Sequence, residues 1–185
     1  MLTGENKGKI DKIWNTFWSG GISDPLRVIE QISFLLFIKR LDDIHTAREK
    51  QANRLDKPIK EPIFGAGQDK LRWSRFREFE AEEMFKTVSQ EVFPFIKNLH
   101  GGEDTAYARH MKDAIFMIPT PSLLERVVEQ ISDVPMEDRD TKGDLYEYML
   151  SKLTTAGTNG QFRTPRHIIR MMVELMQPQP DDIIC

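Results

Sequence analysis

Apolar residues recur at intervals of three and four along almost the whole chain, and this spacing predicts a mainly α-helical protein. Within residues 7–18 the apolar positions are Ile10, Ile13, Trp14, Phe17 and Trp18. Gly20 and Gly21 follow directly and should end this first helix. The same periodicity returns in later segments, namely 85–99, 107–117, 120–131 and 144–153. Short connections between such segments favour a helical bundle.

The second helix should lie at the centre of that bundle. It is expected to begin at Pro25, because Ser23 or Asp24 can cap it and a proline in the first turn sacrifices no hydrogen bond. Residues 26–38 are apolar on nearly every face, which is typical of a helix buried on nearly all sides. The polar far end, residues 42–54, is expected to project into solvent, and residues 55–70 are expected to form a loop.

The C-terminal part of the chain has a different pattern. Residues 154–160 are rich in Thr, Gly and Asn, as loops are, and Thr164-Pro165 should start a helix with Ile168, Met172 and Leu175 facing inward. Residues 182–185 resemble the start of a strand, which would have no partner for its backbone groups. The pattern therefore indicates a piece of a longer protein, with a helical domain at 1–153 and a connecting segment at 154–185.

The composition mainly excludes certain classes of protein and of binding site. The 185 residues include 26 Lys and Arg against 29 Asp and Glu, so a uniformly basic protein that coats nucleic acid is excluded. The only cysteine is Cys185, which excludes an internal disulfide and a cysteine zinc site. The scattered histidines predict no metal site and are expected at surface or capping positions. No apolar run approaches the roughly 20 residues of a membrane span, and a cytoplasmic location is expected.

Recognised catalytic motifs are absent. The chain has no His-Glu-x-x-His, Gly-x-Ser-x-Gly or P-loop pattern, and we predict no catalytic residue in it. The turn Gly160-Gln161-Phe162-Arg163-Thr164-Pro165 has two physical interpretations. It could cap a helix with Phe162 in the core, or it could hold a ligand, because the free N–H groups of a helix start attract an anion.

Several basic and aromatic residues also have two interpretations. Lys39-Arg40, and Arg72, Arg75 and Arg77 interleaved with Trp73 and Phe76, fit either a solvated helix face or contacts to DNA phosphates. Tyr146 and Tyr148 lie on different faces of their helix. They are either both packing residues or divided between the core and a neighbouring domain.

The chain contains three longer motifs in order: Leu35-Leu36-Phe37-Ile38-Lys39-Arg40-Leu41-Asp42-Asp43, then Gly143-Asp144-Leu145-Tyr146-Glu147-Tyr148-Met149-Leu150, and then Gly160-Gln161-Phe162-Arg163-Thr164-Pro165. In this order they resemble the methyltransferase (M) subunit of type I restriction–modification systems. The resemblance covers nearly the whole chain. It implies a helical N-terminal domain that leads into a Rossmann-like domain for S-adenosylmethionine (AdoMet). The family's Asp-Pro-x-x-Gly-Thr-Gly-Gly and Asn-Pro-Pro-Tyr/Phe motifs are not in this sequence.

The resemblance also implies a function. The parent protein would methylate the exocyclic amine of adenine in double-stranded DNA, and this chain alone would be inactive. Gly160, Gln161, Phe162, Arg163, Thr164 and Pro165 would line the cofactor pocket, and Arg163, Arg166 and Arg170 would contact DNA. The implied partners are a specificity (S) subunit, a second M subunit and a restriction (R) subunit, and the helical domain would help to clamp DNA and to assemble these chains.

Two other functions stay open on the residues alone. One is a stand-alone helical adaptor that binds protein partners and has no cofactor. The other is a single-chain enzyme that carries restriction, methylation and specificity regions together. The sequence that follows Cys185 in the parent reading frame would distinguish them.

Overall fold

The computed structural model describes residues 4–99, 111, 114–134, 139–155, 164, 166–179 and 181–182. This part of the chain is mainly helical, as predicted, and contains no strand. The longer helices are α1 (Gly4–Ser19), α2 (Pro25–Arg54), α7 (Pro121–Ser132), α8 (Arg139–Thr155) and α9 (Arg166–Met176). Shorter pieces lie between α2 and α7, namely the 3-10 turn Asp69–Leu71, α3 (Trp73–Phe76), α4 (Ala81–Thr87), a π-helical turn Val88–Val92 and α5 (Phe93–Lys97).

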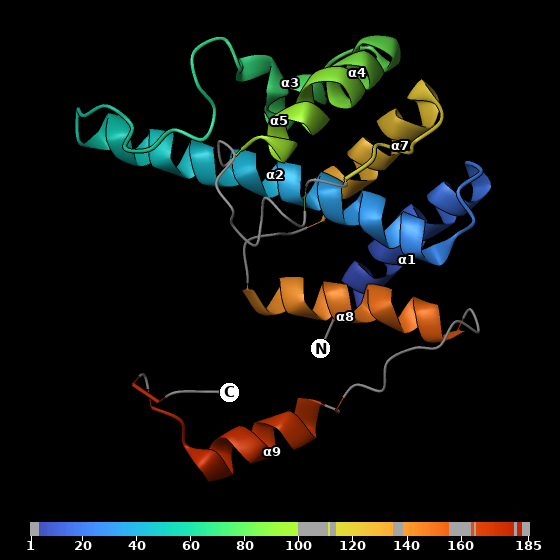
Figure 1. The fold of residues 1–185 in the computed structure, drawn as a ribbon, viewed down its shortest axis with the longest axis vertical. Coiled ribbons are helices and arrows are strands. Elements are labelled where there is room, and N and C mark those ends of the chain that lie inside the picture. The colour runs from blue at the N-terminus through green and yellow to red at the C-terminus, as the bar shows by residue number, and fades with distance from the viewer. Residues whose placement is uncertain are drawn as a thin grey trace.

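Helix α2 is the central element, as its sequence predicted. In Figure 1 it crosses the molecule with α3, α4 and α5 on one side and α1 and α8 on the other. The Asp24 side chain accepts the N–H of Leu26, and Pro25 occupies the first turn. Apolar residues on several of its faces are fully buried, and burying each such side chain stabilises the fold by about 1.5–3 kcal/mol.

The far end of α2 is only partly solvated, which corrects the prediction in part. Asp42 and His45 are both buried, because the loop after α2 folds back along the helix. The Nδ1 atom of His45 accepts the N–H of Ile63 at 3.2 Å, and Arg48 donates to the carbonyl of Glu61. His45 is therefore a core residue that anchors the loop, rather than the surface or capping residue that was expected.

The predicted helix at residues 85–99 forms with one irregularity. The run from α4 to α5 contains a π-helical turn in which the N–H of Phe93 bonds to the carbonyl of Val88. Pro94 follows directly and has no N–H to donate, so the regular hydrogen-bond ladder cannot continue through it. Val88 and Val92 stay buried across the irregular turn.

The segment before α7 is pinned to α2 by one amide. Gln31 is fully buried; its Nε2 atom donates to the carbonyl of Ile115 and its Oε1 atom accepts the N–H of Met117. Residues 114–117 are accordingly not helical, so the predicted end of a helix at 117 is wrong; residues 107–110 and 112–113 lie outside the described residues.

Helix α7 closes the bundle between α1 and α4. Thr120 caps it by accepting the N–H of Leu123, as predicted, and Pro121 opens the first turn. Its buried stripe is Leu123, Leu124, Val127, Val128 and Ile131. Gly20 ends α1 where Leu123 approaches, and a Cβ atom at Gly20 would lie 2.5 Å from the Cδ2 atom of Leu123. The sequence therefore needs glycine there for close packing.

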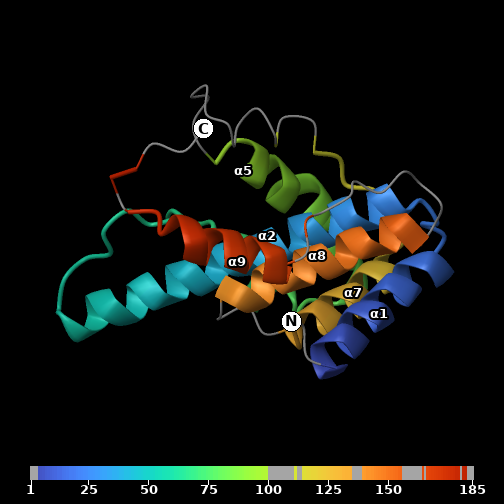
Figure 2. The same cartoon turned by 90° about the horizontal axis from the view of Figure 1, so that it is seen from below.

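Helices α8 and α9 carry the C-terminal part of the chain. Helix α8 packs against α1 and α2, whereas α9 lies beyond it, outside the bundle (Figures 1 and 2). The expected strand falls mainly on residues 183–185, outside the described residues. Among the helices that the structure describes, none combines the length and apolar character that a membrane crossing requires.

Candidate functional site

The predicted cofactor turn is described at a single residue. Thr164 is exposed and immediately precedes the segment that enters α9, whereas Gly160, Gln161, Phe162, Arg163 and Pro165 lie outside the described residues. The first N–H groups of α9 have no acceptor within the helix, so this end can favour an anionic group. The geometry of the turn itself stays a prediction.

The predicted DNA-binding arginines are only partly described. Arg166 begins α9, and Arg170 lies one turn later with 82% of its side chain exposed. The Nε atom of Arg170 lies 2.9 Å from an oxygen of Glu174, an exposed pair that a phosphate could replace at little cost. Arg163 lies outside the described residues, so the three arginines are not shown to form one cluster.

The apolar face of α9 is exposed, which corrects the prediction of an inward stripe. Met172 and Leu175 are 54% and 76% exposed, and Ile168 is half-buried. Further large apolar side chains of this helix are also open to solvent, namely Ile169, Met171, Val173 and Met176. The prediction failed because no other described element covers these side chains. A contiguous apolar surface of this kind marks an interaction face.

Helix α8 is held to the bundle by two tyrosines. The Tyr148 hydroxyl donates to Oδ1 of Asp11 in α1 at 2.6 Å, and Lys152 bonds to the same oxygen. The Tyr146 hydroxyl lies 2.8 Å from that of Ser33 in α2. Burial would raise the pKa of Asp11, but the hydrogen bonds from Lys152 and Tyr148 outweigh it and leave that pKa below its ordinary value. Both tyrosines therefore contact the helical domain.

Arg72 forms the core of a buried ion cluster. Its Nε atom lies 2.7 Å from Asp42, and its two terminal nitrogens donate to Glu49 at 2.9 and 2.8 Å. Asp42 also accepts the backbone N–H of Ser74. Hydrogen bonds to Glu49 have the largest effect and raise the pKa of Arg72. Burial acts in the opposite direction, but with the further bond to Asp42 the pKa stays above its ordinary value. This cluster joins the segment around α3 to α2.

The burial of Arg72 excludes both of its predicted roles, a solvated residue and a DNA contact. Its aromatic neighbours Trp73 and Phe76 are buried too, and the Trp73 Nε1 atom donates to the Ser132 hydroxyl. Arg75 and Arg77 remain exposed. The alternation of arginines and aromatic residues therefore reflects core packing with two outward cations.

Lys39 is also engaged inside the fold. Its Nζ atom donates to the carbonyls of Ile131, Ser132 and Val134, the last at 2.6 Å. The first two of these carbonyls end α7 and the third lies just after it, where a cation compensates the negative end of the helix dipole. Sequence reasoning missed this role because the acceptors lie more than 90 residues away and are backbone atoms, which leave no pattern.

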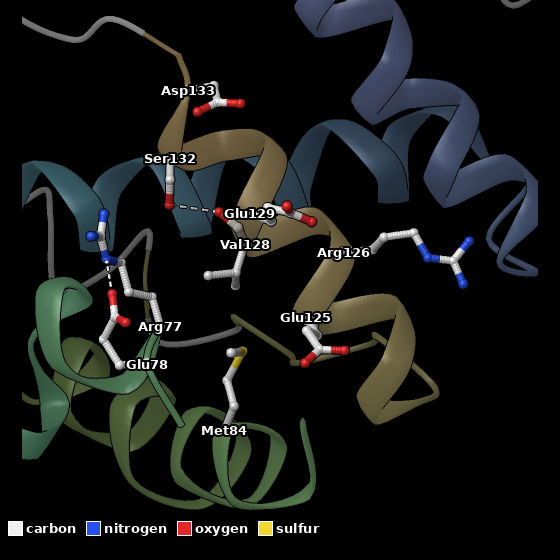
Figure 3. Close-up of a pocket in the computed structure, with 9 residues that line it drawn as sticks. All are labelled: Arg77, Glu78, Met84, Glu125, Arg126, Val128, Glu129, Ser132 and Asp133. Carbon is white, nitrogen blue, oxygen red and sulfur yellow. Dashed lines mark hydrogen bonds and ion pairs between the residues drawn. The ribbon is translucent and has the colours of Figure 1, made fainter. Parts of the chain in front are cut away.

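Two grooves open on either side of the end of α7. The first lies between α7 and the α3–α4 segment, with a volume of about 440 Å³, and its walls are drawn in Figure 3. Glu125 and Glu129 line it from α7 and Asp133 from the residue after this helix, and Arg77, which pairs with Glu78 at 2.8 Å, lies on the opposite wall. In the described part of the chain no group of acidic, His or Cys residues is arranged to hold a metal ion.

The second groove lies between α1, α2 and the segment around α3. Its volume is about 720 Å³, and it shares Arg77, Ser132 and Asp133 with the first groove. Its walls are more basic than those of the first groove, because Lys9, Lys39, Arg40 and Lys50 line it together with Asp42 and Asp43.

Comparison with protein families divides the chain into two matches. Residues 6–131 match the model described as the HsdM N-terminal domain, and residues 137–185 match the model described as N-6 DNA Methylase. The first match ends in α7 and the second begins just before α8. The first match covers more than half of the chain.

Individual relatives agree with these matches. The methylase subunit of the type I restriction enzyme EcoEI from Escherichia coli is 26% identical over 166 residues, which cover 86% of this chain and 33% of that subunit. The EcoKI methylase subunit of Escherichia coli K12 is 26% identical over 118 residues, covering 56% of this chain and 22% of that subunit. The chain thus spans a third or less of the length of these relatives.

Solved structures share the fold. A modification subunit from Vibrio vulnificus YJ016, described as part of a type I restriction enzyme, superposes with a TM-score of 0.71 at 24% identity, over 98% of this chain and 42% of that one. A chain from a structure of a type I restriction–modification complex gives a TM-score of 0.64 at 22% identity, over 97% and 37% of the two chains.

Proposed function

The chain belongs to the HsdM N-terminal domain family, the helical domain of type I restriction–modification methylase subunits, and from this premise we propose the activity of the whole subunit. The subunit transfers a methyl group from AdoMet to the N6 amine of adenine in duplex DNA. The observation that carries the proposal is the order of the two matches, a helical-domain model over 6–131 followed at once by an N-6 methylase model from 137.

The helical domain holds the DNA in position and carries out no chemical step itself. An adenine amine inside a duplex is out of reach of a methyl donor, so the base must be turned out of the stack while the DNA is held. A bundle with a well-packed core can act as a rigid arm for that purpose. The chain by itself is then inactive, because the expected cofactor loop and the Asn-Pro-Pro-Tyr/Phe motif do not occur in its sequence.

The partners follow from the same proposal. An S subunit reads the DNA sequence, a second M subunit completes the methyltransferase, and an R subunit joins for cleavage. A net charge of -3 supports this division, since a chain that read or coated DNA alone would carry an excess of cations. The complex works on DNA in the cytoplasm.

Residues 160–165 are proposed as the methionine side of the cofactor pocket. Support comes from Thr164, which is exposed, and from the N-terminus of α9 two residues later, where free N–H groups suit the carboxylate of AdoMet. When bound, AdoMet supplies the methyl group. Arg163, Arg166 and Arg170 are proposed to hold a DNA phosphate beside that pocket.

The C-terminal segment is proposed to open the catalytic domain. Residues 1–153 form the helical domain in this proposal, and residues 154–185 are the linker and the first part of the AdoMet domain. The exposed apolar face of α9 supports it, because Met172 and Leu175 have no covering element among the described residues and would pack against further methyltransferase structure in this proposal. Such packing would remove the apolar surface from water.

The test is cofactor binding by the full-length subunit. Phe162→Ala combined with Thr164→Ala should weaken AdoMet binding at least tenfold in calorimetry while the helical domain keeps its thermal transition. Leu55→Ala is the control, since Leu55 is an exposed apolar residue of the bundle, and it should leave the affinity unchanged. Unchanged affinity in the double variant would remove residues 160–165 from the pocket.

Methyl transfer tests the activity itself. The full-length subunit assembled with its S subunit should label duplex DNA from radioactive AdoMet, and the 185-residue chain should not. Labelling by the short chain alone would contradict the assignment of the chemistry. A parent reading frame that stops at Cys185 and a protein that binds no AdoMet would favour the helical adaptor instead.

A further inference from the structure

Positive charge gathers in the second groove, on a chain that is acidic overall. Lys9 of α1, Arg40 and Lys50 of α2, and Arg77 after α3 all line this groove. Five basic side chains line the groove against three acidic ones, of which Asp43 and Asp133 are exposed, while Asp42 is buried and already bound by Arg72 and by the N–H of Ser74. The groove is therefore a local cationic surface that the net charge of -3 conceals.

The cations of this groove differ in whether other residues of the protein already bind them. Lys39 is occupied by the carbonyls that end α7. Lys9 and Arg77 pair with the exposed carboxylates of Glu5 and Glu78, and such pairs contribute little. Arg40 and Lys50 form no ion pair or side-chain hydrogen bond with any described residue. These two cations are free to bind an external anion.

Arg40 and Lys50 are spaced for an extended polyanion. They lie on the same side of α2, and ten residues of helix separate them by about 15 Å along the axis. A small anion could contact only one of them, whereas a DNA duplex presents phosphates over such a distance, with a major groove about 12 Å wide. The acidic groove beyond α7, with Glu125 and Glu129, repels phosphate and limits the surface on that side.

We propose that this groove binds the phosphodiester backbone of duplex DNA, with Arg40 and Lys50 as the principal contacts and Lys9 and Arg77 at its edge. The contact is independent of base sequence, because ammonium and guanidinium groups that bind phosphates recognise only their charge and spacing. It is separate from the arginines of residues 163–170. The inference rests on the proposed function, since it takes the protein to act on DNA.

The test measures how the affinity of the assembled, full-length methyltransferase for duplex DNA depends on salt. Each phosphate contact adds about 0.9 to the slope of log affinity against log salt. Loss of two contacts in Arg40→Gln with Lys50→Gln should lower the slope by about 1.8. Between 50 and 200 mM salt the wild type would then lose roughly tenfold more affinity than the variant.

The matched control is Arg54→Gln with Lys57→Gln, which removes the same charge from exposed positions at the end of α2, outside the groove. It should keep the wild-type slope. Equal slopes in the wild type and the groove variant, with methylation intact, would overturn the inference and leave the proposed function standing. An equal reduction in both variants would also overturn it, as a general charge effect.

One further outcome assigns the groove to a different partner. If the groove variant keeps the wild-type salt slope but no longer assembles with the other subunits, the groove binds an acidic protein segment and the DNA inference is wrong. Thermal melting of both variants confirms folding, which the groove variant should not disturb because Arg40 and Lys50 form no ion pair or side-chain hydrogen bond with a described residue. Absence of methylation by the wild-type complex would count against the proposed function instead.

Discussion

Tyr148 donates a hydrogen bond to Asp11 across 2.6 Å, although 137 residues separate them in sequence. Lys152, one turn after Tyr148, bonds to the same carboxylate oxygen and lies over the rings of Trp14 and Tyr148. The N-terminal helix therefore holds the first helix of the segment that matches the N-6 methylase model. One carboxylate joins the two parts of the chain.

Asp11→Asn should loosen α8 by removing the charge that Lys152 and Tyr148 share. Because Asp11 is partly exposed, we expect a loss of only about 0.5–1 kcal/mol of unfolding free energy at neutral pH. Hydrogen exchange should accelerate in α8 more than in α7. Asp181→Asn, at an exposed position in the C-terminal segment, should change neither quantity.

The effect of Asp11 should depend on pH in a defined direction. Its pKa in the folded protein lies below the ordinary value of 3.8, so it stabilises the fold above that value and the contribution disappears as pH falls through the folded pKa. Melting curves of wild type and Asp11→Asn should differ near pH 7 and converge only as the pH falls well below 3.8. A difference that stays constant throughout this acidification would exclude the ionised carboxylate as the cause.

Arg72→Ala should be the most damaging substitution of an arginine in the bundle. It leaves Asp42 buried without its cation, and breaking a buried pair in this way costs about 3–5 kcal/mol. Arg75→Ala is the matched control three residues away, where the side chain is exposed, and should stay within about 0.5 kcal/mol of wild type. Urea denaturation of both variants measures the difference.

Gly20→Ala tests the close approach of α1 and α7. The added Cβ would lie 2.5 Å from the Leu123 side chain, which is buried and has little room to move, so we expect a loss of about 1–3 kcal/mol. Gly8→Ala offers the opposite case, because nothing lies within 4 Å of the new Cβ inside α1. That substitution should stabilise the protein by about 0.5–1 kcal/mol. Equal effects of the two would contradict the packing at Gly20.

Lys39→Met should weaken the end of α7, although it leaves the acidic side chains on the surface of α7 unchanged. The substitution removes three bonds to terminal carbonyls, and we expect a loss of about 1–2 kcal/mol. Lys57→Met, at an exposed position after α2, is the control. Increased amide exchange confined to the last turn of α7 and the residues it contacts would be the specific signature.

Local signals explain what the sequence predicted correctly. Asp24-Pro25 and Thr120-Pro121 each place a capping oxygen and a proline within one turn, so the starts of α2 and α7 could be located without tertiary information. Gly20 and Gly21 likewise located the end of α1 without tertiary information. Helical periodicity likewise identified the segment around α4 and α5, although it could not reveal the π-helical turn.

Long-range pairing explains what the sequence could not show. Asp42, His45 and Arg72 look like solvated residues until the chain after α2 folds back and brings their partners within hydrogen-bond distance. Met172 and Leu175 were expected to face inward because the pattern reveals an apolar face but not its partner. The site predicted at 160–165 depended on family motifs, because a turn of this kind has no periodicity from which its geometry could be derived.

The position of α1 has a consequence during synthesis of the protein. Ile10, Ile13 and Phe17 are fully buried in the finished bundle, where α1 packs along α7, yet α7 begins only at residue 121. At about 5–20 residues per second a ribosome needs roughly 5–20 seconds to make the intervening hundred or so residues. For that interval a nascent amphipathic helix lacks its main packing partner, which makes it a natural binding site for chaperones.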